Sequence, residues 1–305
     1  MEQPWPSAGM KVSQLTAIIE VARAGSFRRA AERLNKSQPS LTRAIAQFEE
    51  EIGIIVFERS PAGTRLTKAG ERIHDRAQTV MATLGRLEDE ARQLGGAQFG
   101  RVRLGVSPVA GTTLLPGALS RFRKDWPGVQ VDVINSLYPD SLIQLREGLL
   151  DMVVGPVPTG KMEEAISVEH LFELQVVLVT HRNHPLRKAT RVSELAGANW
   201  LVHGPAEGPS NLFYQVGSGV LGHGQISLTR CDSLATLLEL VVRCDGITFL
   251  SEPILNTYRK QFGLVQIPIS DPLPKFTVAQ LTRKHEAPTP AARQLQRFIA
   301  LQALS

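Results

Sequence analysis

The chain has 305 residues, of which 43% are hydrophobic, so it can bury a sizeable core in about two to three domains. No apolar run approaches the roughly 18 to 20 residues that a membrane-spanning helix needs, which excludes a protein anchored by such a helix. The net charge of +5 is uneven: residues 11–70 carry ten basic and six acidic side chains while the remainder is almost neutral, as expected of a small module facing an anionic partner.

The first ten residues contain Pro4, Trp5 and Pro6 but no basic stretch followed by an apolar one, so they do not resemble an export signal. We expect residues 1–10 to be a loose N-terminal extension. The two cysteines, Cys231 and Cys244, are too few for a disulfide framework and indicate a reduced, cytoplasmic chain.

Residues 11–66 are predicted to form a small helical domain. The apolar spacing predicts helices over 12–23 and 27–34, with Gly25 ending the first and Ser26 capping the second. A short turn then leads into a third helix over 37–49. Two small helices joined by such a turn form the helix-turn-helix arrangement, whose second helix enters the DNA major groove.

The third helix has one apolar and one polar side. Leu41, Ile45 and Phe48 recur at steps of four and three, so they share a buried face. Hydrogen-bonding side chains occupy the remaining positions, and such groups pair with base edges or phosphates. A solvated polar face is the alternative. The DNA-contact candidates in this helix are Ser37, Gln38, Pro39, Ser40, Thr42 and Arg43.

Beyond the third helix the sequence predicts a two-stranded wing. Residues 54–57 are strand-like, residues 61–63 form a turn, and residues 64–66 return as a second strand. Basic side chains occur near the wing tip and at the start of the second helix, where they would contact the DNA backbone. These further DNA-contact candidates are Arg28, Arg29, Arg59 and Arg65.

Residues 67–94 are predicted to form a long dimerising linker helix capped by Thr67. Apolar residues follow one another at steps of four and three, which is the repeat of a coiled coil. Such a helix is roughly 40 Å long at 1.5 Å per residue and could space two reading helices along DNA. The alternative is a helix lying on its own domain. The predicted dimerisation residues are Ile73, Ala77, Val80, Leu84, Leu87, Ala91 and Leu94.

These motifs resemble the LysR-type transcriptional regulators over residues 11–70. Matching positions are Ala30-Ala31, Leu34, Ser37 to Leu41, Ile45, Glu49, Gly53, Phe57, Arg59, Leu66-Thr67 and Ala69-Gly70. The resemblance implies a sequence-specific DNA-binding regulator that binds a promoter operator as a homodimer or, more often, a dimer of dimers. It also implies a small-molecule effector held by the C-terminal part and RNA polymerase as a further partner.

Residues 95–100 are predicted to be a flexible hinge, and residues 101–305 an α/β effector-binding domain. Strand and helix patterns alternate along it, as in a parallel sheet covered on both faces. We expect strands at 101–106, 129–134, 150–155, 175–180, 200–202, 226–229, 247–250 and 276–281, and helices running through Leu114 to Phe122, over 139–148 and over 291–301.

The last strand and helix are predicted to return to the first unit, giving a two-subdomain sensor that resembles periplasmic binding proteins. Subdomain I would comprise about residues 101–161 and 268–305, and subdomain II about residues 162–267. Ligands of open α/β sheets sit at the carboxyl ends of strands, and the free N–H groups of helix starts favour anions. We therefore expect a small organic acid, with Ser107, Asn135, His203, Asn211 and Ser233 as effector-binding candidates. Ser107 and Ser233 could instead simply cap helices.

Three other signals are weaker. Gly217–Gly222 matches the dinucleotide fingerprint as a string, and an oxidoreductase using it is one alternative, but the segment follows a helix-like stretch rather than a strand. A transporter's solute-binding protein is the other alternative, against which residues 11–94 and the lack of an export signal argue. His181 and His184 have a spacing that a metal could use, but Pro185 favours a turn. Both cysteines are expected to be buried apolar residues, with a redox sensor as the alternative. The sequence thus indicates no metal, no cofactor and no catalytic set.

Overall fold

The computed structural model describes residues 9–60, 63–158, 160, 162–207, 216 and 227–304. The chain divides into two compact units, Met1–Glu88 and Asp89–Ser305, which are described separately below. No described helix has the length and apolar character needed to cross a membrane.

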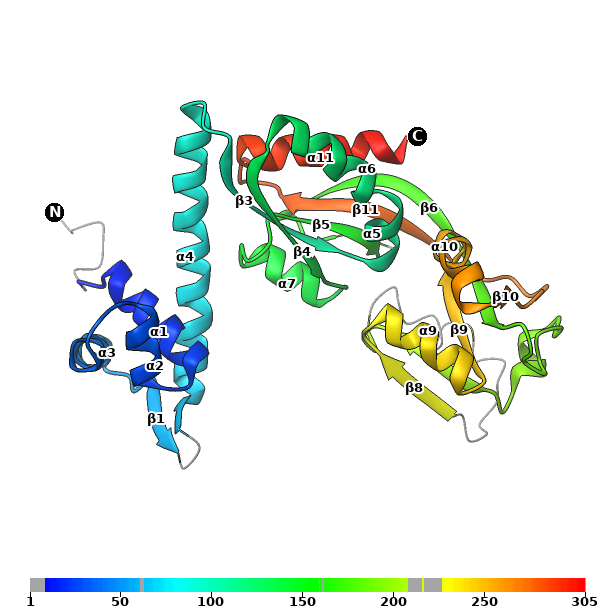
Figure 1. Cartoon of the computed structure of the whole chain (residues 1–305), viewed down its shortest axis with the longest axis horizontal. Helices are drawn as coiled ribbons and strands as arrows, with labels where there is room; N and C mark the ends of the chain where they lie inside the picture. Colours follow the sequence, from blue (N-terminus) through cyan, green and yellow to red (C-terminus); the bar gives the residue numbers. More distant parts are fainter. Residues whose placement is uncertain are drawn as a thin grey trace. The chain divides into compact units, whose positions relative to one another are not determined.

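The first unit is a three-helix domain with a two-stranded wing (Figure 1). Its elements are α1 (Val12–Ala24), α2 (Phe27–Arg33), α3 (Gln38–Ile52), β1 (Phe57–Ser60), β2 (Gly63–Leu66) and the first part of α4 (Lys68–Leu94). Hydroxyl caps fix the starts of two helices, because Ser26 Oγ accepts from Arg29 N and Ser37 Oγ accepts from Ser40 N. The predicted winged helix-turn-helix is therefore present.

The core of this unit joins α3 to the start of α4. Leu41, Ile45 and Phe48 are each at most 2% exposed, as the sequence periodicity predicts. Ala77 of α4 is 2% exposed and Ile73 is partly buried in the same apolar cluster. Ala77 is therefore too buried to contact a partner chain, which corrects its predicted role in dimerisation. Ile73 has only part of its side chain available for such a contact.

The wing starts later than predicted. Residues 54–56 form no strand, and β1 begins at Phe57. The carboxylate of Glu49 explains the difference, because its Oε1 accepts hydrogen bonds from Val56 N at 2.7 Å and Phe57 N at 3.1 Å. A side chain of α3 thus takes the hydrogen bonds that a neighbouring strand would otherwise take, and it ties the wing to that helix.

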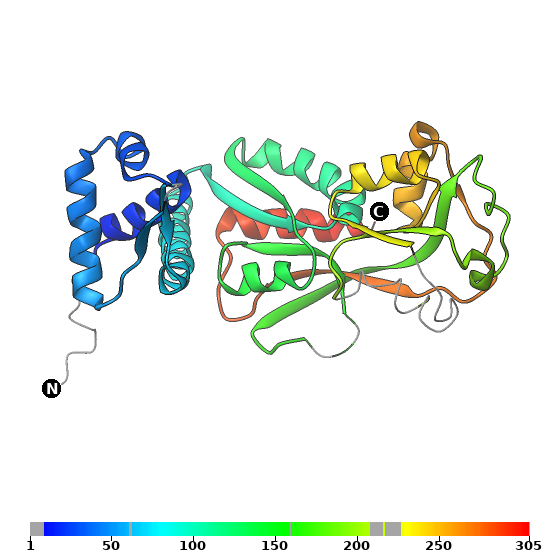
Figure 2. The same ribbon diagram turned by 90° about the horizontal axis from the view of Figure 1, so that it is seen from below.

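The second unit is an α/β domain with a long, continuous path of strands (Figures 1 and 2). Its strands are β3 (Phe99–Val106), β4 (Gly128–Asn135), β5 (Met152–Val157), β6 (Ile166–His181), β7 (Asn199–His203), β8 (Ser227–Cys231), β9 (Gly246–Ser251), β10 (Leu264–Gln266) and β11 (Lys275–Arg283). Its helices are α5 (Pro108–Thr113), α6 (Leu115–Asp125), α7 (Asp140–Arg146), the 3-10 turn η1 (Val192–Leu195), α9 (Leu234–Arg243), α10 (Glu252–Phe262) and α11 (Pro290–Ala303).

The strand order β4-β3-β5-β11-β6-β9-β7-β8 defines two lobes that share β6. The first part of β6 pairs with β11, and its last residues pair with β9 and β10. Figure 2 shows β6 and β11 side by side where the chain passes between the lobes. The return of the last strand to the first lobe is confirmed, since β11 also pairs with β5. This is the expected two-subdomain architecture.

Several local details differ from the expectations, among them β6, which is longer than the strand expected at 175–180. The helix predicted through Leu114 to Phe122 is split at Leu114 into α5 and α6, because Pro116 in the first turn of α6 has no N–H to continue α5. In addition, β3 begins at Phe99, inside the predicted hinge. The end of α4 is held to this unit by Gln93, whose Nε2 donates to Phe99 O and whose Oε1 accepts from Ala291 N.

Gly70 provides a test of the packing between α4 and the wing. A Cβ at this position would overlap the main-chain oxygen of Val56, so backbone would have to move. We expect Gly70→Ala to destabilise the first unit by about 1–3 kcal/mol, the usual cost of overpacking. Hydrogen exchange of residues 12–57 measures this loss.

Gly85→Ala is the matched control, because a Cβ on Gly85 meets nothing within 4 Å in the same helix. It should be neutral or gain up to about 1 kcal/mol from better helix propensity. Equal exchange rates in the two variants would contradict the packing argument.

Candidate functional site

The outer face of α3 is polar and accessible. Gln38, Ser40, Thr42 and Arg43 are all exposed; Arg43 lies opposite the buried apolar stripe, and Ser40 and Thr42 lie on either side of it. The N-terminus of the helix is held by Ser37 through its bond to Ser40 N, and Pro39 occupies the first turn, where its missing N–H costs nothing. The hydrogen-bonding groups predicted to read DNA are thus presented on one rigid surface.

Basic side chains flank this face. Arg28 and Arg29 are exposed at the start of α2, and the ion pair between Arg28 and Glu32 is long at 4.0 Å. Arg65 lies on β2 opposite Glu58, with 2.8 Å between Arg65 Nε and Glu58 Oε1. Arg59 lies on β1, but its side chain is outside the described residues. Exposed pairs of this kind are worth little, so Arg28 and Arg65 can exchange their carboxylates for phosphates.

Beyond Ala77, α4 leaves apolar side chains uncovered within the chain. Val80, Leu87 and Leu94 are 50%, 62% and 73% exposed, while Leu84 is partly buried and Ala91 is exposed. Large apolar side chains spaced by one heptad and left open to solvent are typical of a surface that pairs with another helix.

In the second unit, a cavity of about 100 Å³ opens between the two lobes. It lies at the carboxyl ends of β3, β5, β7 and β9 and beside the changeover in β6, where the general rule for open α/β sheets places ligands. The lining residues are Ser107, Pro108, Val109, Leu137, Pro156, Leu174, Val176, Val202, His203, Leu234, Thr248, Phe249, Leu250, Ser251, Ile254 and Phe276.

Two of the predicted effector-binding residues line this cavity. Ser107 is 2% exposed and caps α5 by accepting from Ala110 N at 3.4 Å. Gly155 allows this position, because a Cβ there would come within 2.9 Å of Ser107 Cβ. His203 lies at the end of β7, and its Nε2 is buried with no partner among the described residues.

Burial keeps His203 neutral. Desolvation lowers the pKa of the imidazole below its ordinary value, and the main chain and carboxylate of Asp232 only partly oppose this effect. The Asp232 main chain raises the pKa, as a carbonyl that accepts from the ring would, and Nε2 has no partner, so we assign the ring proton to Nδ1. The Nε2 atom therefore carries a lone pair and accepts hydrogen bonds.

The other predicted effector residues lie elsewhere. Ser233 is exposed and caps α9 by accepting from Thr236 N at 3.3 Å, so it does not line the cavity. Asn135 also lies off the cavity lining, and its Nδ2 donates across the cleft to Asp232 O at 3.2 Å. Asn211 lies outside the described residues. In the structure Ser233 thus caps a helix and Asn135 bridges the two lobes.

Sequence reasoning missed Ser251 and the apolar wall of the cavity. Ser251 precedes α10, but its hydroxyl makes no cap bond, and its buried Oγ has no partner in the described chain. The wall includes Leu174 and Val176 of β6 and Phe276 of β11. The wall depends on the lobes meeting and has no local pattern in the sequence.

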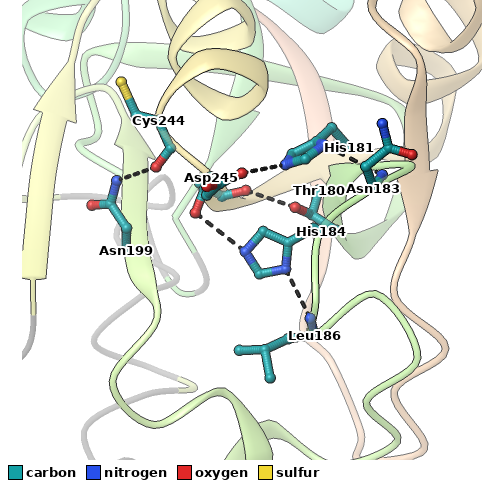
Figure 3. A network of polar contacts seen from close by, with 9 residues as sticks. Thr180, His181, Asn183, His184, Leu186, Asn199, Cys244 and Asp245 are labelled. Carbon is teal, nitrogen blue, oxygen red and sulfur yellow. Dashed lines mark hydrogen bonds and ion pairs between the residues drawn. The ribbon is translucent and has the colours of Figure 1, made fainter.

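His181 and His184 do not form a metal site with a third ligand in the described chain. Both face the turn at Asp245, as Figure 3 shows: His181 Nε2 lies 2.8 Å from the Asp245 carboxylate, and His184 Nε2 lies 3.2 Å from its main-chain oxygen. His184 Nδ1 accepts from Leu186 N at 3.0 Å. Both ring nitrogens of His184 are thus used, and the pair stabilises a turn.

The prediction that both cysteines are buried was wrong. Cys244 is exposed and Cys231 is partly exposed. Cys244 ends α9, where its main-chain oxygen accepts from Asn199 Nδ2 while its side chain faces away (Figure 3). The glycine-rich segment Gly217–Gly222 lies outside the described residues, so the fingerprint interpretation cannot be placed on an element.

Comparison with known families agrees with both parts of the chain. A family model described as "Bacterial regulatory helix-turn-helix protein, lysR family" matches residues 12–71, and one described as "LysR substrate binding domain" matches residues 95–303. The DNA-binding transcriptional dual regulator OxyR of Escherichia coli strain K12 is 28% identical over 280 residues, covering 90% of each chain. The regulator TdcA of the same strain is 25% identical over 279 residues, covering 90% of this chain and 88% of that one.

Solved structures share the fold. A full-length OxyR variant from Pseudomonas aeruginosa has a TM-score of 0.64 at 24% identity and covers 96% of this chain and 94% of its own. CbnR, solved in complex with its target DNA, has a TM-score of 0.70 at 19% identity and covers 96% of this chain and 100% of its own. The helix-turn-helix domain followed by a two-lobed α/β domain is therefore shared across the whole described chain.

The His184 geometry predicts a pH dependence. Desolvation lowers the pKa of this imidazole, and the neighbouring His181 acts in the same direction, while hydrogen bonding to Asp245 opposes them. As the pH falls below about 6.5, the unfolded chain takes up the proton first, so the folded state loses stability. We expect the stability advantage of the wild type over His184→Gln to shrink between pH 7.5 and pH 5.

Urea unfolding followed by tryptophan fluorescence, to which Trp200 contributes from a site that is 1% exposed, measures this difference. The exposed His170 supplies the control, because His170→Gln removes no buried hydrogen bond. An advantage over His184→Gln that stays constant with pH would contradict the neutral, doubly bonded imidazole.

Proposed function

The chain belongs to the LysR family of DNA-binding transcriptional regulators, and we propose that α3 reads an operator while a small molecule in the cleft cavity modulates the promoter contacts. The observation that carries the first part is that Gln38, Ser40, Thr42 and Arg43 are exposed while Leu41, Ile45 and Phe48 of the same helix are buried. Gln pairs well with adenine and Arg with guanine in the major groove.

The basic residues around α3 have a separate role in this proposal. Arg28 and Arg29 start the helix that crosses the DNA backbone in helix-turn-helix proteins, and Arg65 lies in the wing. These side chains hold phosphates and set the register of α3 without reading sequence. Arg59 is proposed for the same role on its position in β1 alone.

We assign the dimer contact to the exposed part of α4. Val80, Leu84, Leu87, Ala91 and Leu94 continue the heptad spacing after the helix leaves its own domain core. Pairing two such helices buries these side chains and gives each dimer two copies of α3, as half-site recognition requires. Two dimers would form the homotetramer that bends or spans the operator.

The effector is proposed to bind in the cavity between the lobes, with Ser107 and His203 among its contacts. A ligand there contacts both lobes and can favour one arrangement of them over another. The coupling needed is about 1–3 kcal/mol, an ordinary allosteric range. RNA polymerase is the proposed recipient of the resulting change, and the cytoplasm is the proposed location because the DNA is there. No catalytic step is part of this proposal.

We do not propose a peroxide response through an internal disulfide for this chain, although several relatives are named hydrogen peroxide-inducible genes activators. The sequence holds only Cys231 and Cys244, which lie at opposite ends of α9. A helix of that length separates them by about 15 Å at 1.5 Å per residue. Disulfide formation requires Cα atoms within about 7 Å.

Arg43→Ala tests the reading face. We expect a loss of about 1–3 kcal/mol in operator affinity together with a relaxed sequence preference, because a bidentate contact to a base is removed. Selection of bound sites from a random DNA pool, followed by footprinting and titration, measures both effects.

Arg28→Ala is the matched comparison. It should weaken binding to all sequences about equally and lower the salt slope of log K by about one, as expected for a phosphate contact. If Arg43→Ala behaves in the same way, or leaves affinity and footprint unchanged, α3 does not read bases through Arg43.

Leu87→Glu tests the dimer contact. A charge at the centre of the exposed stretch should prevent close helix pairing, because the carboxylate would be buried without a partner. We expect a shift toward monomer at micromolar concentration in sedimentation equilibrium and a loss of footprinting over paired half-sites. Gln78→Glu places the same charge on α4 outside the predicted heptad positions and should leave the assembly intact.

A further inference from the structure

We propose that the cleft cavity selects an uncharged effector with an apolar body and a hydroxyl or N–H group that donates a hydrogen bond to His203 Nε2, rather than an organic acid. The inference rests on the proposed effector site and concerns the class of molecule that the site accepts. It replaces the organic acid expected from the sequence.

The described lining of the cavity carries no charged side chain, since it contains no Lys, Arg, Asp or Glu. A carboxylate moved into this cavity would lose its hydration without gaining a cationic partner among the lining residues, which disfavours its binding.

His203 Nε2 is buried at the cavity without a partner among the described residues, and burial favours the neutral imidazole. We assign the single ring proton to Nδ1, on the side of the Asp232 main chain, so that Nε2 presents a lone pair to the cavity. A carboxylate has only lone pairs and would face this atom with like polarity. A hydroxyl or an N–H group supplies the missing proton.

Two serine hydroxyls of the cavity lining, those of Ser107 and Ser251, can donate hydrogen bonds to a ligand. Ser107 Oγ already accepts from Ala110 N, which leaves its O–H free to donate. Ser251 Oγ is buried without a partner in the described chain and does not cap α10. An alcohol can therefore donate to His203 and accept from a serine at once, whereas a hydrocarbon would leave all three groups unsatisfied.

The rest of the described cavity wall is mainly apolar and would contact the body of the ligand. Leu174, Val176, Phe249 and Phe276 form apolar walls from both lobes around these few polar groups. Such a cavity gains from burying a compact ring or branched alkyl group and uses its few polar atoms to orient it. The site is thus built for an amphiphilic neutral molecule.

The test uses three probes that share one ring and one exocyclic carbon: benzyl alcohol, toluene and sodium benzoate. Each is titrated into the full-length protein at pH 7.5, and the melting temperature of the α/β domain is measured against probe concentration. We expect benzyl alcohol to bind at least tenfold more tightly than benzoate and severalfold more tightly than toluene.

Four variants locate the effect. His203→Phe keeps a ring but removes the acceptor, so benzyl alcohol should lose its advantage over toluene, whereas His203→Gln, which can still accept, should keep part of it. Ser251→Ala should reduce benzyl alcohol binding. Ser233→Ala is its matched control, because Ser233 caps α9 without lining the cavity.

Val109→Phe fills the cavity and should abolish binding of every probe. Benzoate binding as tightly as benzyl alcohol, with both blocked by Val109→Phe, would overturn the inference while leaving the effector site in place. Failure of all three probes to bind, or binding indifferent to Val109→Phe, would overturn the inference and the site together. Operator affinity measured on the same protein shows separately whether the DNA-binding function stands.

Discussion

The backbone ladder of β6 is the constraint on which the ligand cleft depends. Ile166 to Gln175 pair with β11, whereas Val176 to His181 pair with β9 and β10, so one strand belongs to both lobes. Leu174 and Val176, on either side of this changeover, project to the same face because side chains alternate along a strand, and both line the cavity. The hydrogen bonds that join the lobes therefore also fix where a ligand can sit.

In the first unit, too, a single set of contacts holds several elements together. The core that buries the apolar side of α3 also receives Ala77 of α4, and Glu49 of α3 holds the first strand of the wing. The reading helix, the wing and the start of the linker helix thus form one packed body. The exposed heptad positions from Val80 onward begin where that body ends, so pairing through them would orient two whole reading domains rather than two isolated helices.

The sequence predicted those features that a local repeat or a cap dictates. The buried stripe of α3, the Ser37 cap and the return of β11 to the first lobe follow from periodicity and order along the chain. The start of β1 was missed because Glu49 satisfies the N–H groups of residues 56 and 57 from another element. The length of β6 was missed because its exposed first half is held only by pairing with the distant β11. The cavity wall and the Nε2 lone pair of His203 likewise exist only once both lobes are in place.

One main-chain carbonyl links ligand recognition to lobe contact. Asp232 O accepts a hydrogen bond from Asn135 of the other lobe, and the main chain of Asp232 also hydrogen bonds His203. A ligand that donates to His203 Nε2 polarises the imidazole and strengthens its Nδ1–H bond to Asp232, since hydrogen bonds in a chain reinforce one another at low dielectric. Asp232 thus lies between the proposed ligand contact at His203 and the hydrogen bond from Asn135 of the other lobe. An effector that lacked a donor would fill the cavity but leave the His203 imidazole unpolarised.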